Sequence, residues 1–458
     1  MRTVQVDVVI IGAGSAGMSA YRAARKHTDK IVIIEADQFG TTCARVGCMP
    51  SKLLISAANA NHQAQNTDAF GIHVNGSVEV NGQEVMQRVK SERDRFVGFV
   101  IDTIKSYNPE HVIKGYAKFI DEKTVHINQE YRIEGKAFVI ATGSRPRVNE
   151  EWKILGDKLQ VNDDIFDWDD LPKSIAVMGT GVIGLEIGQA LSRLGVRTQI
   201  FGRTENIGGI SDPVVLEKAH QVFKSELNIH FNTTPKISLE GNKVRLNYAE
   251  KVDYVDLLLA ASGRIPNTDY LGLESIGVQL DKKGVPITNP QTMQTSIPHI
   301  FIAGDASNYL PLLHVASDQG DTAGHNAGIY PKVEKGLVRS RLSVVFSEPQ
   351  IVVIGQSYRD LDLDSTIIGM VEFENQGRSR VMLVNRGTLR VYFDRQTKVF
   401  LGAEMFGPAA EHIGHLLAWS HQSALNIDQM LAMPFYHPVI EEGLRTALRD
   451  AKAKFPLV

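Results

Sequence analysis

The stretch VQVDVVIIGAGSAGMSAYRAARK, residues 4–26, is a short apolar run followed by a glycine-rich turn and then by apolar residues at helical spacing. A second apolar run, KIVIIEAD at residues 30–37, comes next. Short apolar runs next to glycine indicate strands, and the spacing of Met18, Tyr21 and Ala24 indicates a helix. The segment therefore predicts a strand–helix–strand unit at the start of the chain.

The same pattern recurs in KSIAVMGTGVIGLEIGQALSRLGVRTQIFGR at residues 173–203. In each copy, three glycines follow the first strand and open the helix: Gly12, Gly14 and Gly17, and then Gly179, Gly181 and Gly184. The backbone N–H groups and the helix dipole at such a turn can receive a pyrophosphate. We therefore expect two dinucleotide-binding units. The alternative is that these glycines only make tight turns.

The ends of the second strands differ between the two copies. Glu35 ends that strand in the first copy, where a carboxylate can accept hydrogen bonds from a ribose diol. The second copy ends at Phe201, followed by Gly202 and Arg203. Arg203 is either a partner for the 2′-phosphate of NADP or a solvated surface charge, so the choice between NAD and NADP stays open.

Composition limits the function classes. The chain has 458 residues, 43% hydrophobic and 22% charged, which is typical of a globular protein of two or three domains. With 49 Lys+Arg against 52 Asp+Glu, the net charge of −3 favours no nucleic-acid or anionic-membrane partner. No apolar run has the length of a membrane helix, and the first residues resemble a strand more than a signal peptide. We expect a soluble, cytoplasmic protein.

Three further segments mark the ends of expected strands, and the first two resemble paired domain exits. KAFVIATGSRP carries Thr142 and Gly143, and YVDLLLAASGRIPN carries Gly263 in the matching place. IPHIFIAGDAS places Asp305 just past a strand, where open α/β sheets bind ligands.

The pattern of apolar and polar residues changes from about Leu342. LSVVFSEPQIVVIG, TIIGMVEF, RVMLVNR, LRVYFD and KVFLGAEMFG are strand-like runs, and EHIGHLLAWSHQSAL and IEEGLRTALRDAKA read as helices. We therefore expect an α/β chain with two Rossmann-like dinucleotide-binding domains and a C-terminal α+β domain. The first dinucleotide-binding domain is expected at 1–147 and again at 266–340, the second at 148–265, and the α+β domain at 341–458.

The two cysteines, Cys43 and Cys48, stand five positions apart in GTTCARVGCMPSKLLISAANA. A helix that starts near Thr41 or Thr42 would carry both thiols. Residues five apart in an ideal helix lie roughly 8.6 Å apart, beyond the reach of a disulfide. Gly47 and a proline at position 50 let the turn distort enough to close the ring.

A thiol at a helix N-terminus has a stabilised thiolate, so this pair can pass two electrons. Lys52, one turn beyond Cys48, could bring a positive charge to the electron source. A metal half-site would need two more ligands, and we expect no metal. Two buried, inert cysteines are the remaining alternative.

MPFYHPVIEEGLRTAL carries His437 directly before a proline and Glu442 five residues later. Thiol interchange needs a base that takes a proton from a dithiol, and histidine titrates in the right range. Glu442 could orient the ring. Taken alone, a histidine before a proline is more often structural.

TTCARVGCMPSK, the two glycine loops, FIAGDAS and HPVIEE together closely resemble the flavin-dependent pyridine nucleotide disulfide oxidoreductases. The PSK ending is most similar to that of dihydrolipoamide dehydrogenase. The resemblance implies that 1–147 and 266–340 bind FAD, that 148–265 binds NAD or NADP, and that 341–458 forms a homodimer. It implies FAD contacts at Gly12, Gly14, Gly17, Glu35, Thr42, Thr142, Gly143 and Asp305, and nicotinamide dinucleotide contacts at Gly179, Gly181 and Gly184, with Arg203 and Gly263 as further candidates.

The same resemblance implies the roles of the reacting groups. Cys43 would attack the substrate and Cys48 would contact the flavin, with Lys52 paired to Glu186 beside the flavin ring. His437 and Glu442 would reach the active site from the other subunit. The expected reaction passes two electrons between a dihydrolipoamide-like dithiol, either free or as a protein-bound lipoyl group, and NAD(P)⁺.

Several positions depart from the family pattern. Thr41 and Arg45 stand where Gly and Asn are usual, so a cation lies between the two thiols in the sequence, and Val439 and Glu441 replace Thr and Ser. Arg203, together with Arg22 as a contact for an acidic tripeptide, keeps an NADPH-dependent, glutathione reductase-like enzyme open. Mercuric reductase and high-molecular-weight thioredoxin reductase would need a C-terminal cysteine pair. A flavin-bound redox sensor without turnover is the alternative outside the enzymes.

Overall fold

The computed structural model describes residues 1–456 and forms two compact units. The first comprises Met1–Pro50, Arg88–Arg147 and Arg264–Arg339, and the second comprises Ser51–Gln87, Val148–Gly263 and Ser340–Val458. The helices α3 (Cys48–Gln65) and α4 (Gly82–Lys105) have residues in both units. The four-part division expected from the sequence stays a prediction. Within residues 1–456, no helix has both the length and the apolar character needed to cross a membrane.

The first unit contains the first predicted strand–helix–strand unit. Its main sheet has the strand order β3 (Val112–Lys114), β2 (Ile31–Glu35), β1 (Arg2–Ile11), β6 (Tyr131–Ile140), β5 (Thr124–Ile127) and β4 (Ala117–Asp121), and β17 (Ile300–Ile302) also pairs with β6. The strands β3, β2, β1, β6 and β17 are parallel, whereas β5 and β4 form an antiparallel edge. A small antiparallel pair, β7 (Ser144–Pro146) and β16 (Arg264–Pro266), completes this unit.

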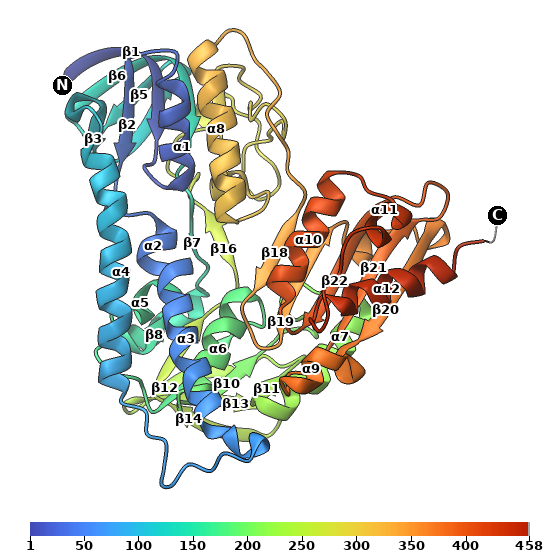
Figure 1. Cartoon of the computed structure of the whole chain (residues 1–458). Coiled ribbons are helices and arrows are strands. Elements are labelled where there is room, and N and C mark those ends of the chain that lie inside the picture. Colours follow the sequence, from blue (N-terminus) through green and yellow to red (C-terminus); the bar gives the residue numbers. More distant parts are fainter. Residues whose placement is uncertain (457–458) are drawn as a thin grey trace. The chain divides into compact units, whose positions relative to one another are not determined.

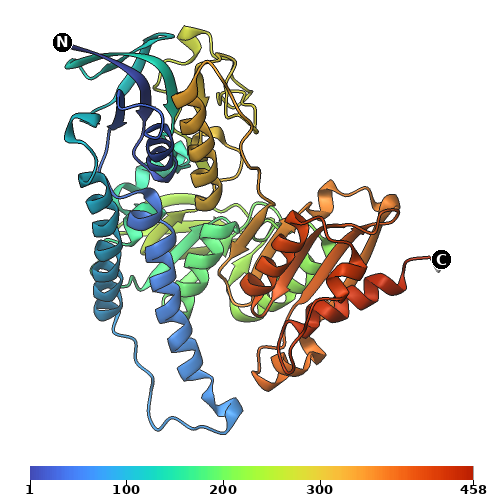
Figure 2. The ribbon, with the colours of Figure 1, turned by 45° about the horizontal axis from the view of Figure 1, so that its top comes forward.

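Two helices of the first unit lie side by side because small residues line their contact. These are α1 (Ser15–Ala24), which follows the first glycine loop, and α8 (Leu313–Ile329), as Figures 1 and 2 show. A Cβ atom added to Gly320 would lie 2.2 Å from the carbonyl oxygen of Ala16, and one added to Gly324 would lie 2.2 Å from that of Ala20. The contact therefore requires glycine, and it fixes the helix that opens at the glycine loop.

The second unit contains the second predicted strand–helix–strand unit. Its parallel sheet has the order β11 (Ile229–His230), β10 (Arg197–Phe201), β9 (Ser174–Met178), β15 (Leu257–Ala260) and β8 (Leu159–Gln160). An antiparallel sheet follows β12 (Lys236–Glu240), β13 (Lys243–Tyr248) and β14 (Lys251–Val255). The helices of this part are α5 (Asn162–Ile165), α6 (Val182–Arg193) and α7 (Pro213–Glu226).

The predicted C-terminal α+β region is also present in the second unit. Its antiparallel sheet has the order β18 (Leu342–Val345), β19 (Gln350–Gly355), β22 (Phe400–Gly407), β21 (Thr388–Asp394) and β20 (Thr366–Glu372). Two helices, α10 (Ala410–Gln422) and α12 (Glu442–Ala453), bury apolar side chains against it, and α11 (Ile427–Leu431) lies between them in the chain.

The prediction of a strand at RVMLVNR, residues 380–386, is wrong. The structure has the short helix α9 (Gly377–Val381) there, capped by Gln376, whose side chain accepts a hydrogen bond from the N–H of Ser379. Val381 and Leu383 are exposed, and Leu383 has a φ of 56°, which ends any extended run. The consecutive apolar residues therefore lie on a turn at the surface.

The contact between α1 and α8 predicts a difference between two glycines of the same helix. Gly324→Ala should lower the free energy of unfolding by about 1–3 kcal/mol, because its Cβ meets the backbone of Ala20, which cannot rotate away. Gly328→Ala is the milder comparison, since its Cβ would lie 3.0 Å from the His27 side chain and 3.3 Å from the Cα of Ala24, whereas the Cβ at Gly324 would lie 2.2 Å from a backbone oxygen. Urea unfolding of both variants checks this, and equal losses of stability would contradict the steric argument.

Candidate functional site

The first glycine loop is shaped by backbone contacts. Gly12 has a φ of +107°, and its Cβ would lie 2.3 Å from the carbonyl oxygen of Ala141. A Cβ on Gly17 would lie 1.8 Å from the oxygen of Gly12. At Gly14, the N-cap of α1, the described residues leave the Cβ position open and provide no side-chain cap. The loop therefore brings the N-terminal N–H groups of α1 to an open space, which fits a pyrophosphate.

The second glycine loop repeats this geometry. Gly179 has a φ of +137°, with its Cβ position 2.3 Å from the oxygen of Ala261, and the Cβ position of Gly184 is 2.0 Å from the oxygen of Gly179. Gly181 is the N-cap of α6 and, among the described residues, it too has an open Cβ position and no side-chain cap. The chain thus holds two loops that fit the pyrophosphate of a dinucleotide.

The end of β2 carries the expected carboxylate. The Oε2 of Glu35 accepts a hydrogen bond from the N–H of Ala13 at 2.8 Å, and its Oε1 accepts one from the N–H of Asp37 at 2.9 Å. The carboxylate is thereby held against the first glycine loop, where a ribose diol would meet it. At the end of β10, Phe201 is buried and Arg203 is exposed.

Hydrogen bonds in the first unit tie together the other expected FAD contacts. The hydroxyl of Thr142 donates to the carbonyl oxygen of Asn267 at 2.7 Å, and the side-chain amide of Asn267 donates to the carbonyl oxygen of Thr142 at 3.1 Å. The hydroxyl of Ser144 donates to Asp305 at 2.7 Å. Sequence reasoning did not select Ser144 or Asn267, although Ser144 directly follows Gly143 and Asn267 lies four residues after Gly263.

Two glycines beside these motifs have left-handed backbones. Gly143 has a φ of +68° and Gly263 a φ of +117°, and a Cβ on either would meet no described atom within 4 Å. Both therefore leave space beside the strand ends, although a contact with a cofactor at either stays a prediction.

The cysteine segment begins as a helix near Thr42, as expected, but Gly47 divides it. Cys43 is the second residue of α2 (Thr42–Val46) and is half-buried, whereas Cys48 is the first residue of α3 and is exposed. Gly47, with φ −130° and ψ −115°, is not helical. The predicted distortion between the cysteines is therefore present, and Pro50 lies in the first turn of α3, where no intrahelical N–H is needed.

Both unusual residues of this segment make contacts of their own. Thr41 has a φ of 60°, and its hydroxyl accepts a hydrogen bond from the N–H of Ala44 at 3.3 Å. The guanidinium of Arg45, the cation that stands between the two cysteines in the sequence, donates to the carbonyl oxygen of Gln38 at 3.3 Å. Its positive charge is therefore held at the turn that precedes the cysteines.

The predicted ion pair between Lys52 and Glu186 is confirmed. The Nζ of Lys52 lies 2.7 Å from the Oε2 of Glu186, whose side chain is only 5% exposed. The Oε1 of Glu186 accepts a hydrogen bond from the N–H of Phe346 at 2.9 Å. Phe346 was not predicted as a site residue. The carboxylate is therefore buried with both oxygens engaged, which is the arrangement that a buried charge requires.

The predicted contact between His437 and Glu442 is also present. The Nδ1 of His437 lies 3.0 Å from the Oε2 of Glu442, which also accepts a hydrogen bond from the N–H of Val439 at 3.3 Å, and the guanidinium of Arg445 donates to Oε1. Burial alone would raise the pKa of Glu442, but the bonds from Val439 and His437 and the charge of Arg445 lower it overall. Since Nδ1 faces the carboxylate, the exposed Nε2 can take a proton.

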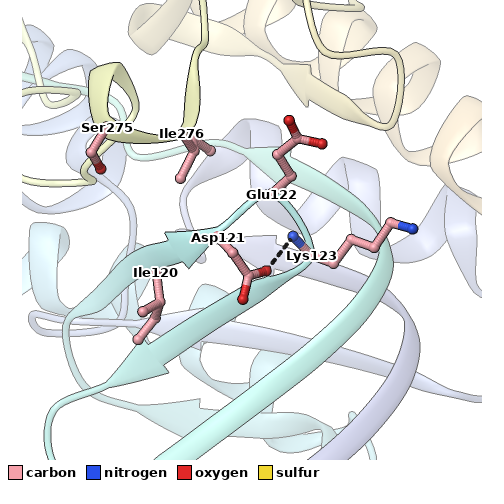
Figure 3. A pocket seen from close by; sticks show the side chains of 6 residues that line it. All are labelled: Ile120, Asp121, Glu122, Lys123, Ser275 and Ile276. Carbon is pink, nitrogen blue, oxygen red and sulfur yellow. Dashed lines mark hydrogen bonds between the residues drawn. The ribbon is translucent and has the colours of Figure 1, made fainter.

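The first unit also has a pocket. It is a shallow hollow at the β4–β5 turn, lined by Ile120, Asp121, Glu122, Lys123, Ser275 and Ile276 (Figure 3). The N–H of Lys123 donates to the side chain of Asp121 at 2.8 Å. None of the predicted site residues lines it. Within residues 1–456, no group of three or more His, Cys, Asp or Glu residues has the arrangement of a metal site.

Arg22, considered as a contact for an acidic substrate, donates from its guanidinium to the hydroxyl of Ser19 at 3.0 Å, one turn earlier in α1. A contact between Arg22 and an acidic substrate stays a prediction.

Comparisons with known proteins agree with these features. Residues 6–320 match the family model described as pyridine nucleotide-disulphide oxidoreductase, and residues 342–448 match the dimerisation domain of that family. The chain is 28% identical to mercuric reductase of Staphylococcus aureus over 463 residues, which cover 96% of this chain and 81% of the relative. It is 28% identical to dihydrolipoyl dehydrogenase of Geobacillus stearothermophilus over 451 residues, 96% of this chain and 94% of the relative.

Solved structures share the fold. LpdA from Mycobacterium tuberculosis matches with a TM-score of 0.83 at 22% identity, and the HOCl-induced flavoprotein disulfide reductase RclA from Escherichia coli matches with 0.81 at 20%. Each match covers 97% of this chain and 99% of the other.

Enzymes of the matched family use FAD and NAD(P), and the dimerisation domain indicates a homodimer. The chain, with two dinucleotide loops and a dimerisation domain in the family order, belongs to the pyridine nucleotide-disulphide oxidoreductase family.

Proposed function

We propose that this chain is a flavoprotein that passes two electrons between a dithiol of the dihydrolipoamide kind and NAD(P)⁺ through Cys43 and Cys48. The observation that carries the proposal is the division of the cysteine segment at Gly47, which places one cysteine near the start of α2 and the other at the start of α3. Lys52 follows one turn later on α3 and is held by Glu186. The curated relative named dihydrolipoyl dehydrogenase supports this substrate class.

The thiol chemistry balances with the residues at hand. A substrate thiolate attacks the sulfur of Cys43, the Cys43–Cys48 bond breaks, and Cys48 leaves as a thiolate. The second substrate thiolate then displaces Cys43, so the substrate leaves as a disulfide and both cysteines are reduced. His437 of the second copy in the dimer takes the substrate protons at Nε2, while Glu442 holds its Nδ1. The position of Cys43 at a helix N-terminus stabilises its thiolate.

The dinucleotide sites supply the other half of the reaction. FAD held at the first glycine loop would supply the two-electron chemistry that connects the two thiols to the nicotinamide. Gly14 and Gly181 would present the helix N-termini to the two pyrophosphates, and Glu35 would accept hydrogen bonds from the FAD ribose. Lys52 supplies a positive charge near the electron acceptor. A cytoplasmic location belongs to the same proposal, because thiols that must turn over fit a reducing compartment.

A second candidate is an NADPH-dependent disulfide reductase that runs the same steps in reverse. The exposed position of Arg203 just beyond β10, where the NAD-type acid is replaced by the buried Phe201, favours this candidate. The direction of electron flow depends on the reduction potentials of the substrate pairs.

Replacing either cysteine tests the thiol relay. Cys43→Ser and Cys48→Ser should each lower dihydrolipoamide oxidation by about a thousandfold or more, because a hydroxyl cannot take part in disulfide exchange. Steady-state NADH formation measures this loss. Transfer from NADH to an artificial dye needs only the flavin and is the internal control. Wild-type turnover in either variant would contradict the relay, and protein that binds no flavin would defeat the whole proposal.

The histidine pair predicts a graded loss. His437→Gln should lower the dithiol oxidation rate by about 10²- to 10⁴-fold, the usual range for removal of a general base. Glu442→Gln should lower the same rate less, by about tenfold, because the imidazole of His437 remains but loses the carboxylate that orients it. Dye reduction should stay unchanged in both variants. Equal activity of His437→Gln and the parent enzyme would assign the base to another residue.

Arg203 predicts the nicotinamide preference. Arg203→Leu should lower kcat/KM for NADPH by about tenfold to a hundredfold, the loss typical of a charge-assisted hydrogen bond to phosphate, and should leave NADH within about twofold. The comparison uses oxidised lipoamide and oxidised glutathione as acceptors. Equal effects on the two nucleotides would show that Arg203 is only a surface charge.

A further inference from the structure

Phe346 contacts both members of the Lys52–Glu186 pair. Its N–H donates to the Oε1 of Glu186 at 2.9 Å, while the centroid of its ring lies 4.4 Å from the Nζ of Lys52. The ammonium of Lys52 thus meets a carboxylate oxygen at 2.7 Å and an aromatic face. This aromatic residue lies in the loop between β18 and β19, far from both partners in the chain.

The position of this loop is set by one face of α6. Glu186, Gln189 and Arg193 follow one another at spacings of three and four residues, so they share a face. The side-chain oxygen of Gln189 accepts a hydrogen bond from the N–H of Glu348 at 2.8 Å, and its amide donates to the carbonyl oxygen of Glu348 at 2.8 Å. Arg193 forms an ion pair with the carboxylate of Glu348. The backbone of the loop is therefore held at Phe346 and at Glu348, which fixes the point from which the ring extends.

Lysine needs such restraint if its charge is to stay in one place. Its ammonium is strongly hydrated and sits on a flexible four-carbon stem, and the side chain of Lys52 is 34% exposed. An ion pair with Glu186 alone would let the ammonium pivot towards water. An aromatic face on a second side attracts the cation and displaces water from it.

We propose that Phe346 is a positioning residue that holds the ammonium of Lys52 at a fixed place beside the electron acceptor, through its ring and through the N–H that anchors Glu186. The inference rests on the proposed function for the identity of the acceptor, but the contact itself is independent of it. Phe346 acts through Lys52, whose ammonium it contacts.

The first measurement tests the contact. The purified protein is treated briefly with acetic anhydride, and mass spectrometry gives the acetylation rate of Lys52 relative to other lysines. Phe346→Leu keeps the N–H that binds Glu186 but removes the ring, and it should raise the rate at Lys52 by about three- to tenfold. Phe346→Tyr keeps an aromatic face and should match the parent. Phe99→Leu, whose ring lies beside Arg95, is the matched control for loss of an aromatic ring and should also match it.

The second measurement tests the consequence. In Phe346→Leu, the midpoint potential of the bound flavin should be more negative than in the parent, because a mobile cation stabilises negative charge on the reduced acceptor less well. Phe346→Tyr should restore the parent value. Thermal unfolding verifies that each variant is folded, and Phe346→Met replaces Phe346→Leu if the latter does not fold.

The outcomes separate the two proposals. An unchanged Lys52 acetylation rate in Phe346→Leu overturns the restraint. A raised rate with an unchanged flavin potential overturns the assigned purpose of the restraint. Absence of flavin from the parent protein, or absence of thiol-dependent turnover, overturns the proposed function while the acetylation result still decides whether the ring restrains Lys52.

Discussion

The buried carboxylate of Glu186 is the constraint on which the arrangement of the second unit depends. A carboxylate that is 5% exposed is costly unless its oxygens are paired, and here Lys52 takes one oxygen and the N–H of Phe346 takes the other. Glu186 stands in the second turn of α6, and α6 itself opens at the second glycine loop. One helix thus joins a dinucleotide loop, the helix that carries Lys52 and the loop before β19.

In both glycine loops, the surrounding backbone decides which positions must be glycine. The first and third glycines of each loop are required by backbone atoms at about 2 Å from any added Cβ, whereas the middle glycine faces open space. The outer glycines therefore serve the packing of strand against helix, and the middle glycine serves the approach of a phosphate. The same geometry recurs at Gly179, Gly181 and Gly184. This recurrence argues against a chance match of the sequence to the glycine pattern.

Much of the architecture was predictable from local sequence. Apolar runs and glycine turns indicated both strand–helix–strand units, and the position of Glu35 followed from the length of its unit. The pairing of Lys52 with Glu186 came only from the resemblance, since the two residues lie 134 positions apart. No local sequence pattern could predict that Phe346 contacts Lys52 and Glu186, because the three residues lie on segments that meet only in the folded chain.

The wrong strand prediction has a physical reason too. RVMLVNR is apolar enough for a strand, but it lies at the surface, where a Gln376 cap and a left-handed Leu383 turn the chain.

The central claim is that two cysteine thiols exchange an electron pair with a bound flavin. Anaerobic titration of the purified protein with dithionite, followed by the flavin absorbance spectrum, tests it most directly. The account predicts uptake of two electron pairs per flavin, one by the Cys43–Cys48 disulfide and one by the flavin itself. Complete reduction after a single electron pair would contradict it, because the cysteines would then take no part in the redox chemistry.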